Sequence, residues 1–228
     1  MRTKLIYALA IAGGLLLLRD LYVILLVFPN EANQGAVYRI LFFHVPSWMV
    51  CFTSYFAGGV ASVLYLVRRK AVYDEVAVSA IEVGVVFTCI GLVTGSIWGR
   101  SAWGIWWTWD PRLTWAFITL LVYVGYLMLR HAIGDPTERA KTSSVFCIFA
   151  FTSVVITYKA IDWWRTQHPG PVLDFRTGGG NLPPSWETMW KVNLLALAMI
   201  AASIMLIRIR QEKVRREIES LRRQAYSL

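Results

Sequence analysis

Two histidines are the residues in this sequence with the clearest capacity to bind a metal. Only three histidines are present, and His44 and His168 lie in segments that connect apolar stretches on the same side of a predicted membrane domain. Neutral imidazole is the commonest nitrogen ligand for metals in proteins. Two imidazoles on opposite faces of a porphyrin would make a six-coordinate haem iron. His131 lies beside Arg130 on the other side, and we interpret it as a solvated surface residue.

Tryptophan is concentrated around these histidines. All 11 tryptophans fall in predicted outer loops or at outer ends of spans, whereas an ordinary aromatic belt would occupy both membrane interfaces. The one-sided distribution predicts an aromatic surface for a flat apolar ligand, because indoles stack on π-systems. The alternative interpretation is a large interfacial anchor. The densest segment, residues 98–115, contains six tryptophans, and five of them lie between residues 98 and 109: Trp98, Trp103, Trp106, Trp107 and Trp109.

The segment 103–110 reads Trp-Gly-Ile-Trp-Trp-Thr-Trp-Asp. If it is helical, Trp103, Trp106 and Trp107 share one face and offer three indole rings together. Asp110 precedes Pro111 at the start of an apolar run, which is typical of a helix N-cap followed by the first helical residue. We expect Asp110 mainly to cap that helix.

Arginines flank the tryptophan segment. They could pair with haem propionates, and the candidates are Arg100, Arg112, Arg165 and Arg176. His44 ends segment 35–44, where Val37, Ile40 and Leu41 would share its helical face, so His44 could point toward the membrane. Val45-Pro46 is expected to break that helix and start the second span. From the residues alone, haem is the favoured ligand, ahead of a quinone or a lipid.

The composition is that of a membrane protein. Of the 228 residues, 57% are hydrophobic and only 16% are charged, which excludes a disordered chain and a soluble acid-rich enzyme. Helices are the only open-chain way to cross a hydrocarbon core of about 30 Å. The sequence predicts an all-α fold, a single domain over residues 1–228, with six transmembrane helices near 5–28, 48–67, 76–98, 113–129, 142–161 and 189–207. The first span is too long for a convincing signal peptide, and we expect it to be retained.

The distribution of basic residues predicts the orientation. One set of span ends and loops contains 15 Lys and Arg residues, and the opposite loops contain 5. The positive-inside rule therefore places both termini in the cytoplasm and loops 29–47, 99–112 and 162–188 outside. The basic tail, residues 208–228, is expected to continue the sixth span as a charged helix near anionic lipid headgroups. Nucleic-acid binding is a poor second interpretation of the net charge of +9.

Charged residues fall inside the first and third predicted spans, namely Arg19, Asp20 and Glu82. Such charges are costly in lipid and face either the protein interior or a partner subunit. Arg19 and Asp20 could form a satisfied pair, with Glu82 as a candidate partner. The three cysteines, Cys51, Cys89 and Cys147, form no CxxC pair, and we assign them no chemistry.

The segment 103–110 resembles the tryptophan-rich "WWD" signature of haem-handling membrane proteins. The segment His44-Val45-Pro46-Ser47-Trp48 and the six-span layout resemble the cytochrome c maturation protein C (CcmC) family, over nearly the whole chain. The resemblance implies that His44 and His168 are the axial ligands of a non-covalently bound b-type haem. It also implies that the WWD segment contacts haem and a chaperone through Trp103, Gly104, Trp106, Trp107, Trp109 and Asp110.

The same resemblance implies a haem-binding protein rather than an enzyme. Haem would be held on the periplasmic face of the bacterial inner membrane and passed to the haem chaperone CcmE, beside the ABC-type subunits CcmA and CcmB and the small subunit CcmD. One alternative is a haem permease. Its polar path through the membrane could use only Arg19, Asp20, Glu82 and Lys159. A partner would have to hydrolyse any ATP, since the sequence has no GxxxxGK loop. Another is a haem lyase or quinone oxidoreductase, which the absence of cysteine from the outer loops disfavours.

Overall fold

The computed structural model describes residues 2–170, 173–174, 179–180 and 182–226. These residues form six α-helices, each long and apolar enough to cross a membrane. The multi-pass, all-α prediction is therefore confirmed. Five of the helices are longer than the apolar stretches that predicted them, and α1 is the exception. The bounds are α1 (Arg2–Tyr22), α2 (Leu41–Arg68), α3 (Ala71–Trp103), α4 (Pro111–Ala132), α5 (Pro136–Trp163) and α6 (Pro184–Tyr226).

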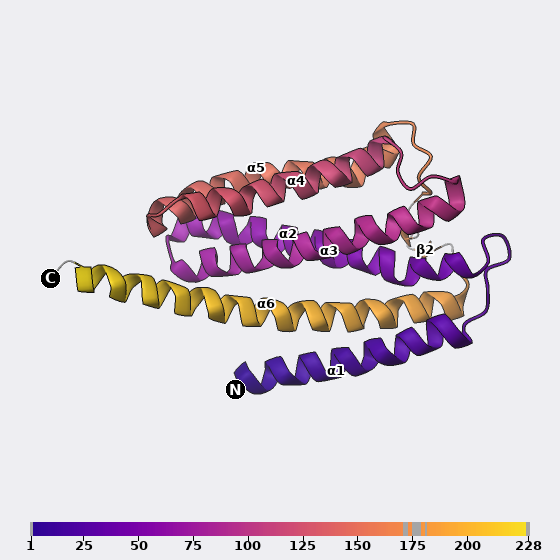
Figure 1. Ribbon diagram of the computed structural model, residues 1–228, viewed down its shortest axis with the longest axis horizontal. Helices are drawn as coiled ribbons and strands as arrows, with labels where there is room; N and C mark the ends of the chain where they lie inside the picture. The colour runs from indigo at the N-terminus through magenta and orange to yellow at the C-terminus, as the bar shows by residue number, and fades with distance from the viewer. Residues whose placement is uncertain (1, 171–172, 175–178, 181, 227–228) are drawn as a thin grey trace.

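The helices run alternately up and down. Figure 1 shows α2 and α3 in the middle, α4 and α5 on one side of them, and α6 followed by α1 on the other. All 11 tryptophans lie toward the end where α1, α3 and α5 finish and α2, α4 and α6 begin, which we call the tryptophan end. The opposite end, where α1 begins, is the terminal end.

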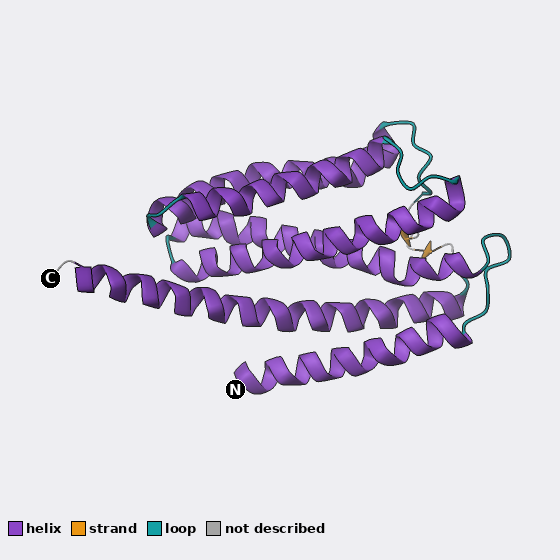
Figure 2. Cartoon of the chain, viewed as in Figure 1, coloured by secondary structure: helices purple, strands orange, loops and turns teal. Residues whose placement is uncertain are grey.

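Short irregular elements lie at the tryptophan end, where Figure 2 shows the longer loops. A π-helical turn (Val23–Val27) extends α1, and a 3-10 helix (Ala36–Ile40) leads into α2. Beyond α5, the strands β1 (Leu173–Asp174) and β2 (Gly179–Gly180) pair antiparallel. These loops bring residues from distant parts of the chain around the open ends of α2, α3 and α4.

The last helix extends well beyond a membrane core. With 43 residues, α6 is about 64 Å long at 1.5 Å per residue, against a core of about 30 Å. Its basic tail packs on the terminal end through ion pairs, with Arg216 at 2.8 Å from Asp74 and Glu219 at 2.8 Å from Arg139. Asp74 is also bound by Arg130 of α4 at 2.6 and 3.1 Å. The predicted continuation of the sixth span as a charged helix is confirmed.

Pro46 does not break the helix that contains His44, so that prediction is wrong. α2 runs without interruption from Leu41 to Arg68 with Pro46 inside it. Proline has no N–H, so the carbonyl of Phe42, four residues earlier, loses its helical partner. Asn193 of α6 replaces that partner, because its Nδ2 donates to the Phe42 carbonyl at 2.5 Å in the buried interface. A neighbouring helix thus allows proline within the span.

This contact predicts a coupling between Asn193 and Pro46. We expect Asn193→Leu to destabilise the protein, since it leaves a buried carbonyl without a donor. In a Pro46→Ala background the helix supplies its own N–H to the Phe42 carbonyl. There, Asn193→Leu should lower the free energy of unfolding by about 1–2 kcal/mol less than it does with Pro46 present. Thermal unfolding of the four variants in detergent gives this difference. Equal costs in the two backgrounds would show that Asn193 does not compensate for proline.

The ion pairs of the charged residues inside the spans differ in one respect from the predicted ones. Arg19 and Asp20 form an ion pair at 2.8 Å, whereas Glu82 binds Arg208 of α6. The interpretation of Glu82 as their partner is therefore wrong. The reason is the order of the helices, because α6 lies between α1 and α3 (Figure 1).

Cys51 and Cys147 are buried and Cys89 is exposed, and none is disulfide-bonded.

Candidate functional site

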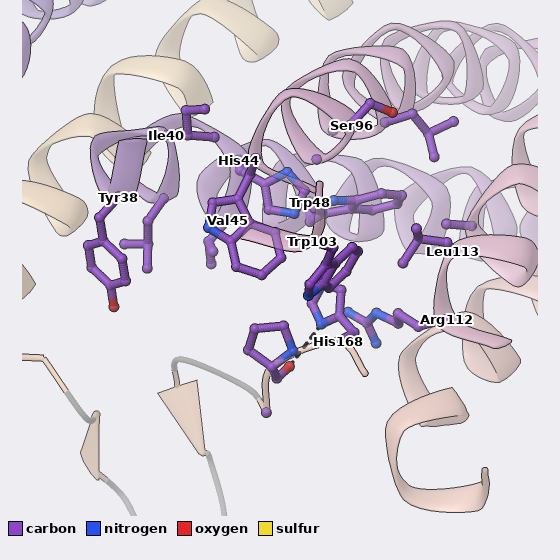
Figure 3. Close-up of a pocket in the computed structure, with 18 of the residues that line it drawn as sticks. Tyr38, Ile40, His44, Val45, Trp48, Ser96, Trp103, Arg112, Leu113 and His168 are labelled. Carbon is purple, nitrogen blue, oxygen red and sulfur yellow. Dashed lines mark hydrogen bonds between the residues drawn. The ribbon is translucent and has the colours of Figure 1, made fainter. Parts of the chain in front are cut away.

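A cavity opens at the tryptophan end between α2, α3, α4 and the segment that follows α5. Its volume is about 520 Å³, within the range of roughly 300–1,000 Å³ for small-molecule sites. Figure 3 shows His44 and His168 on its wall, together with Trp48, Trp103 and Arg112. The two predicted ligands come from distant parts of the chain and line one cavity.

Two glycines of α3 fix how the rings of α2 lie. His44 and Trp48 are one helical turn apart, and both face α3. A Cβ at Gly95 would lie 2.9 Å from His44 Cε1, and one at Gly91 would lie 2.7 Å from Trp48 Cε2. Only glycine at these positions leaves room for both rings against the α3 backbone. The expectation that His44 could point toward the membrane is wrong, because α2 begins only at Leu41 and turns His44 into the cavity.

The hydrogen bonds of His44 assign its tautomer. His44 Nδ1 lies 3.0 Å from Thr94 Oγ1, and the Thr94 hydroxyl lies 2.7 Å from the Ile90 carbonyl, to which it donates. A hydroxyl has only one proton, so it must accept from His44 Nδ1–H. A neutral imidazole with Nδ1–H engaged keeps its lone pair on Nε2, which is the arrangement of a metal-binding histidine oriented through its other nitrogen.

His168 reaches the same state through a different partner. Its Nδ1 lies 2.8 Å from the Pro169 carbonyl, which can only accept a proton, so Nδ1 carries hydrogen and Nε2 carries the lone pair (Figure 3). Burial, together with the nearby Arg112 cation, lowers the pKa of His168 to about 4. The imidazole is thus neutral at pH 7 and available as a ligand.

Asp110 holds the segment that carries His168. Its carboxylate accepts from the backbone N–H of Arg112 at 2.9 Å, which confirms the predicted cap of α4. It also accepts from the Thr166 hydroxyl at 2.6 and 2.7 Å and from the Gln167 backbone N–H at 2.9 Å. The Thr166 oxygen in turn accepts from the His168 backbone N–H at 3.0 Å. One buried carboxylate therefore joins the start of α4 to the chain beside His168.

The predicted arginines lie in different places. Arg112 lines the cavity, and its Nη1 donates to the carbonyls of Thr157 and Tyr158 on α5 at 2.8 and 3.0 Å. Arg100 is exposed at the end of α3, where it binds the Gly104 carbonyl. Arg165 is exposed in the loop after α5, and Arg176 lies outside the described residues. Of the predicted arginines that the structure describes, Arg112 alone is on the cavity wall.

The tryptophan segment is not one helix, so the prediction that Trp103, Trp106 and Trp107 share a helical face is wrong. α3 ends at Trp103 because Gly104 takes the left-handed conformation with φ of 78°, a common helix terminator. Trp103 and Trp107 nevertheless line the cavity with Trp98, whereas Trp106 and Trp109 are 60% and 74% exposed. The segment therefore presents some of its indoles to the cavity and others outward.

The aromatic wall is held by contacts that the sequence did not indicate. Trp98 packs edge-on against Trp103 at a centroid distance of 5.0 Å, and its ring lies 6.5 Å from that of His168. Its Nε1 donates to Gln34 Oε1 at 2.8 Å. Gln34 and Thr94 were not predicted as site residues, and neither stands out in the sequence. The placement of Trp48 could have been found, since it follows His44 by one helical turn.

Comparisons with known proteins assign nearly the whole chain to one family. The family model described as "Heme exporter protein C" matches residues 1–224. Relatives with that name include proteins from Bradyrhizobium diazoefficiens, 36% identical over 93% of this chain and 80% of its own length, and from Paracoccus denitrificans, 35% identical over 85% and 80%. The Escherichia coli K12 protein of the same name is 30% identical over 80% of this chain and 73% of its own length.

Proposed function

Because the chain belongs to the Heme exporter protein C family, we propose that it binds haem in the cavity of the tryptophan end and serves the biogenesis of c-type cytochromes. The observation that supports this most strongly is the pair of imidazoles on one cavity wall, each with Nδ1 engaged and with no partner for Nε2 among the described residues. His44 and His168 are the proposed axial ligands of a non-covalently bound b-type haem.

The other residues of the cavity fit the rest of a haem. Trp48, Trp103 and Trp107 supply flat apolar surface for the ring. Arg112 donates to two backbone carbonyls through Nη1, and a guanidinium has five N–H donors, so donors remain for a propionate. Arg100 donates away from the cavity, at the Gly104 carbonyl, which leaves Arg112 as the better candidate.

The excess of basic residues at the terminal end supports an orientation with that end in the cytoplasm. The tryptophan end then faces the periplasm from a bacterial inner membrane. Haem bound there would be passed to a chaperone of the CcmE type, with CcmA, CcmB and CcmD as further partners. The exposed rings of Trp106 and Trp109, beside the cavity, give a chaperone an apolar surface on which to dock.

Handover is favoured over movement of haem through the protein. A polar path would need charges that are not already neutralised by an ion pair, yet Arg19 is paired with Asp20, Glu82 with Arg208 and Lys159 with Asp162. A role in catalysis has less support still, because the sequence has no cysteine in the predicted outer loops. We therefore propose a haem-holding protein and no enzymatic activity.

The function is tested by following haem from this protein to its acceptor. Purified from haem-replete membranes and mixed with the soluble domain of a CcmE-type chaperone, the protein should lose its haem absorption as the chaperone gains it. A Trp106→Ala/Trp109→Ala variant should retain its haem and transfer it about tenfold more slowly, the effect of removing one or two interface anchors. If the purified protein carries no haem, the binding proposal is refuted. If the variant transfers haem at the same rate as the unmodified protein, the docking proposal is refuted.

A further inference from the structure

α1 carries a charged side chain on a face that none of the described residues covers. Figure 1 shows α1 at the edge of the bundle, beside α6. Its span, Thr3–Val27, is the least buried of the six. The side chain of Arg19 is 55% exposed on this helix, whereas that of Asp20 is fully buried. More than half of the Arg19 side chain is therefore exposed to the surroundings of the bundle, although its Nη1 reaches the buried Asp20 carboxylate.

The depth of Arg19 makes its exposure unfavourable in lipid. It lies about 12 Å from the Val27 end of the span and only about 6 Å from the middle, at 1.5 Å per residue. Arginines near helix ends reach headgroups with their long side chains. For Arg19 this route is poor, because Cα–Cβ bonds tilt toward the N-terminus of a helix, here the more distant end. Its Nη1 is also held 2.8 Å from Asp20 Oδ1.

The same stripe of α1 has small residues. Ala8, Ala12, Leu15 and Arg19 follow one another at spacings of four, three and four and are all exposed. Two alanines four residues apart allow a second helix to approach closely in a membrane. Arg19 would then lie within that contact, with most of its five N–H donors still available beyond the one bound to Asp20.

A second copy in a two-fold arrangement would bring its own Arg19, a donor and not an acceptor, to this position. We propose that this face of α1, which we call the Arg19 face (Ala8, Ala12, Leu15 and Arg19), binds a transmembrane helix of a different polypeptide. That helix carries a side-chain oxygen acceptor, from Asn, Gln, Asp or Glu, at the depth of Arg19. An acceptor is sufficient, since the Arg19–Asp20 pair is already neutral overall. The cavity lies on other helices, so the proposal does not depend on haem binding.

Photo-crosslinking in native membranes tests this proposal. The photoreactive residue p-benzoylphenylalanine replaces Leu15, with replacement of Phe149, an exposed residue of α5, as the matched control. The Leu15 position should form an adduct with a second polypeptide, and the crosslinked peptide should be a transmembrane segment with an acceptor residue within one turn. Because Arg19→Leu alone would leave Asp20 buried and unpaired, the test variant is Arg19→Leu/Asp20→Leu.

In that double variant the Leu15 adduct should fall about tenfold, the loss expected from one interhelical polar contact. Adducts at Phe149 and the haem absorption spectrum should stay unchanged, which separates this proposal from the proposed function. The proposal is overturned if Leu15 labels only lipid or a second copy of this chain. It is also overturned if the crosslinked segment has no acceptor, or if the adduct survives the double substitution.

Discussion

Replacing His44 or His168 with alanine is expected to abolish the six-coordinate, low-spin absorption spectrum of the haem-loaded protein. Each imidazole has its Nδ1–H bound, to Thr94 or to the Pro169 carbonyl, and each offers Nε2 to the same cavity. With one imidazole removed, the iron would keep a single protein ligand, and haem retention should fall by at least about tenfold. Visible spectra and the haem content of the purified variants measure both effects.

His131→Ala is the matched control for these variants. His131 is exposed near the terminal end, where its Nδ1 contacts the Leu127 carbonyl, so its removal should leave the haem spectrum and content unchanged. Unchanged spectra in both the His44 and the His168 variants would remove these residues as ligands. A change in only one of them would reduce the site to a single protein ligand.

Asp110→Ala is expected to have the second largest effect, because this carboxylate has two tasks. It caps α4 through Arg112 N–H, and it holds Thr166 and Gln167 next to His168. The cap alone is worth about 1 kcal/mol. Loss of the contacts to the His168 segment should in addition lower haem retention by about 10- to 100-fold, as loss of an outer-shell partner does at metal sites. Titration of the apoprotein with haem measures this affinity.

Asp135 provides the control for the capping task. It occupies the corresponding position at the start of α5, where it accepts from Thr137 N–H and Glu138 N–H at 2.9 Å before Pro136, but it lies at the terminal end away from the cavity. Asp135→Ala should therefore lower stability by about 1 kcal/mol and leave haem affinity unchanged. If Asp110→Ala behaves in the same way, Asp110 is only a helix cap and does not position His168.

Much of the fold could be predicted because it follows from local patterns. Six apolar stretches of sufficient length leave no other architecture in a bilayer. The Asp110-Pro111 pair predicted the start of α4 for the same reason, since capping depends on adjacent residues. The two histidines could be assigned to the same side of the membrane, because span number and charge distribution decide this without tertiary contacts.

Predictions that depended on distant residues were less successful. Proline predicted a break at Pro46, but Asn193, nearly 150 positions away, supplies the missing hydrogen bond. The spacing of the tryptophans favoured a helix, yet Gly104 ends α3, and neighbouring indoles point in different directions. The partner of Glu82 could not be known before the order of the helices placed Arg208 beside it.

The nitrogen coordination of the bound iron is decisive for the proposed ligation by His44 and His168. Pulsed electron paramagnetic resonance of the ferric protein, purified with ¹⁵N-labelled histidine, counts the imidazole nitrogens bound to iron. Bis-histidine ligation predicts a low-spin centre with two histidine ligands, and with one such ligand after His168→Ala. A high-spin centre with one histidine nitrogen or none in the unmodified protein would contradict it.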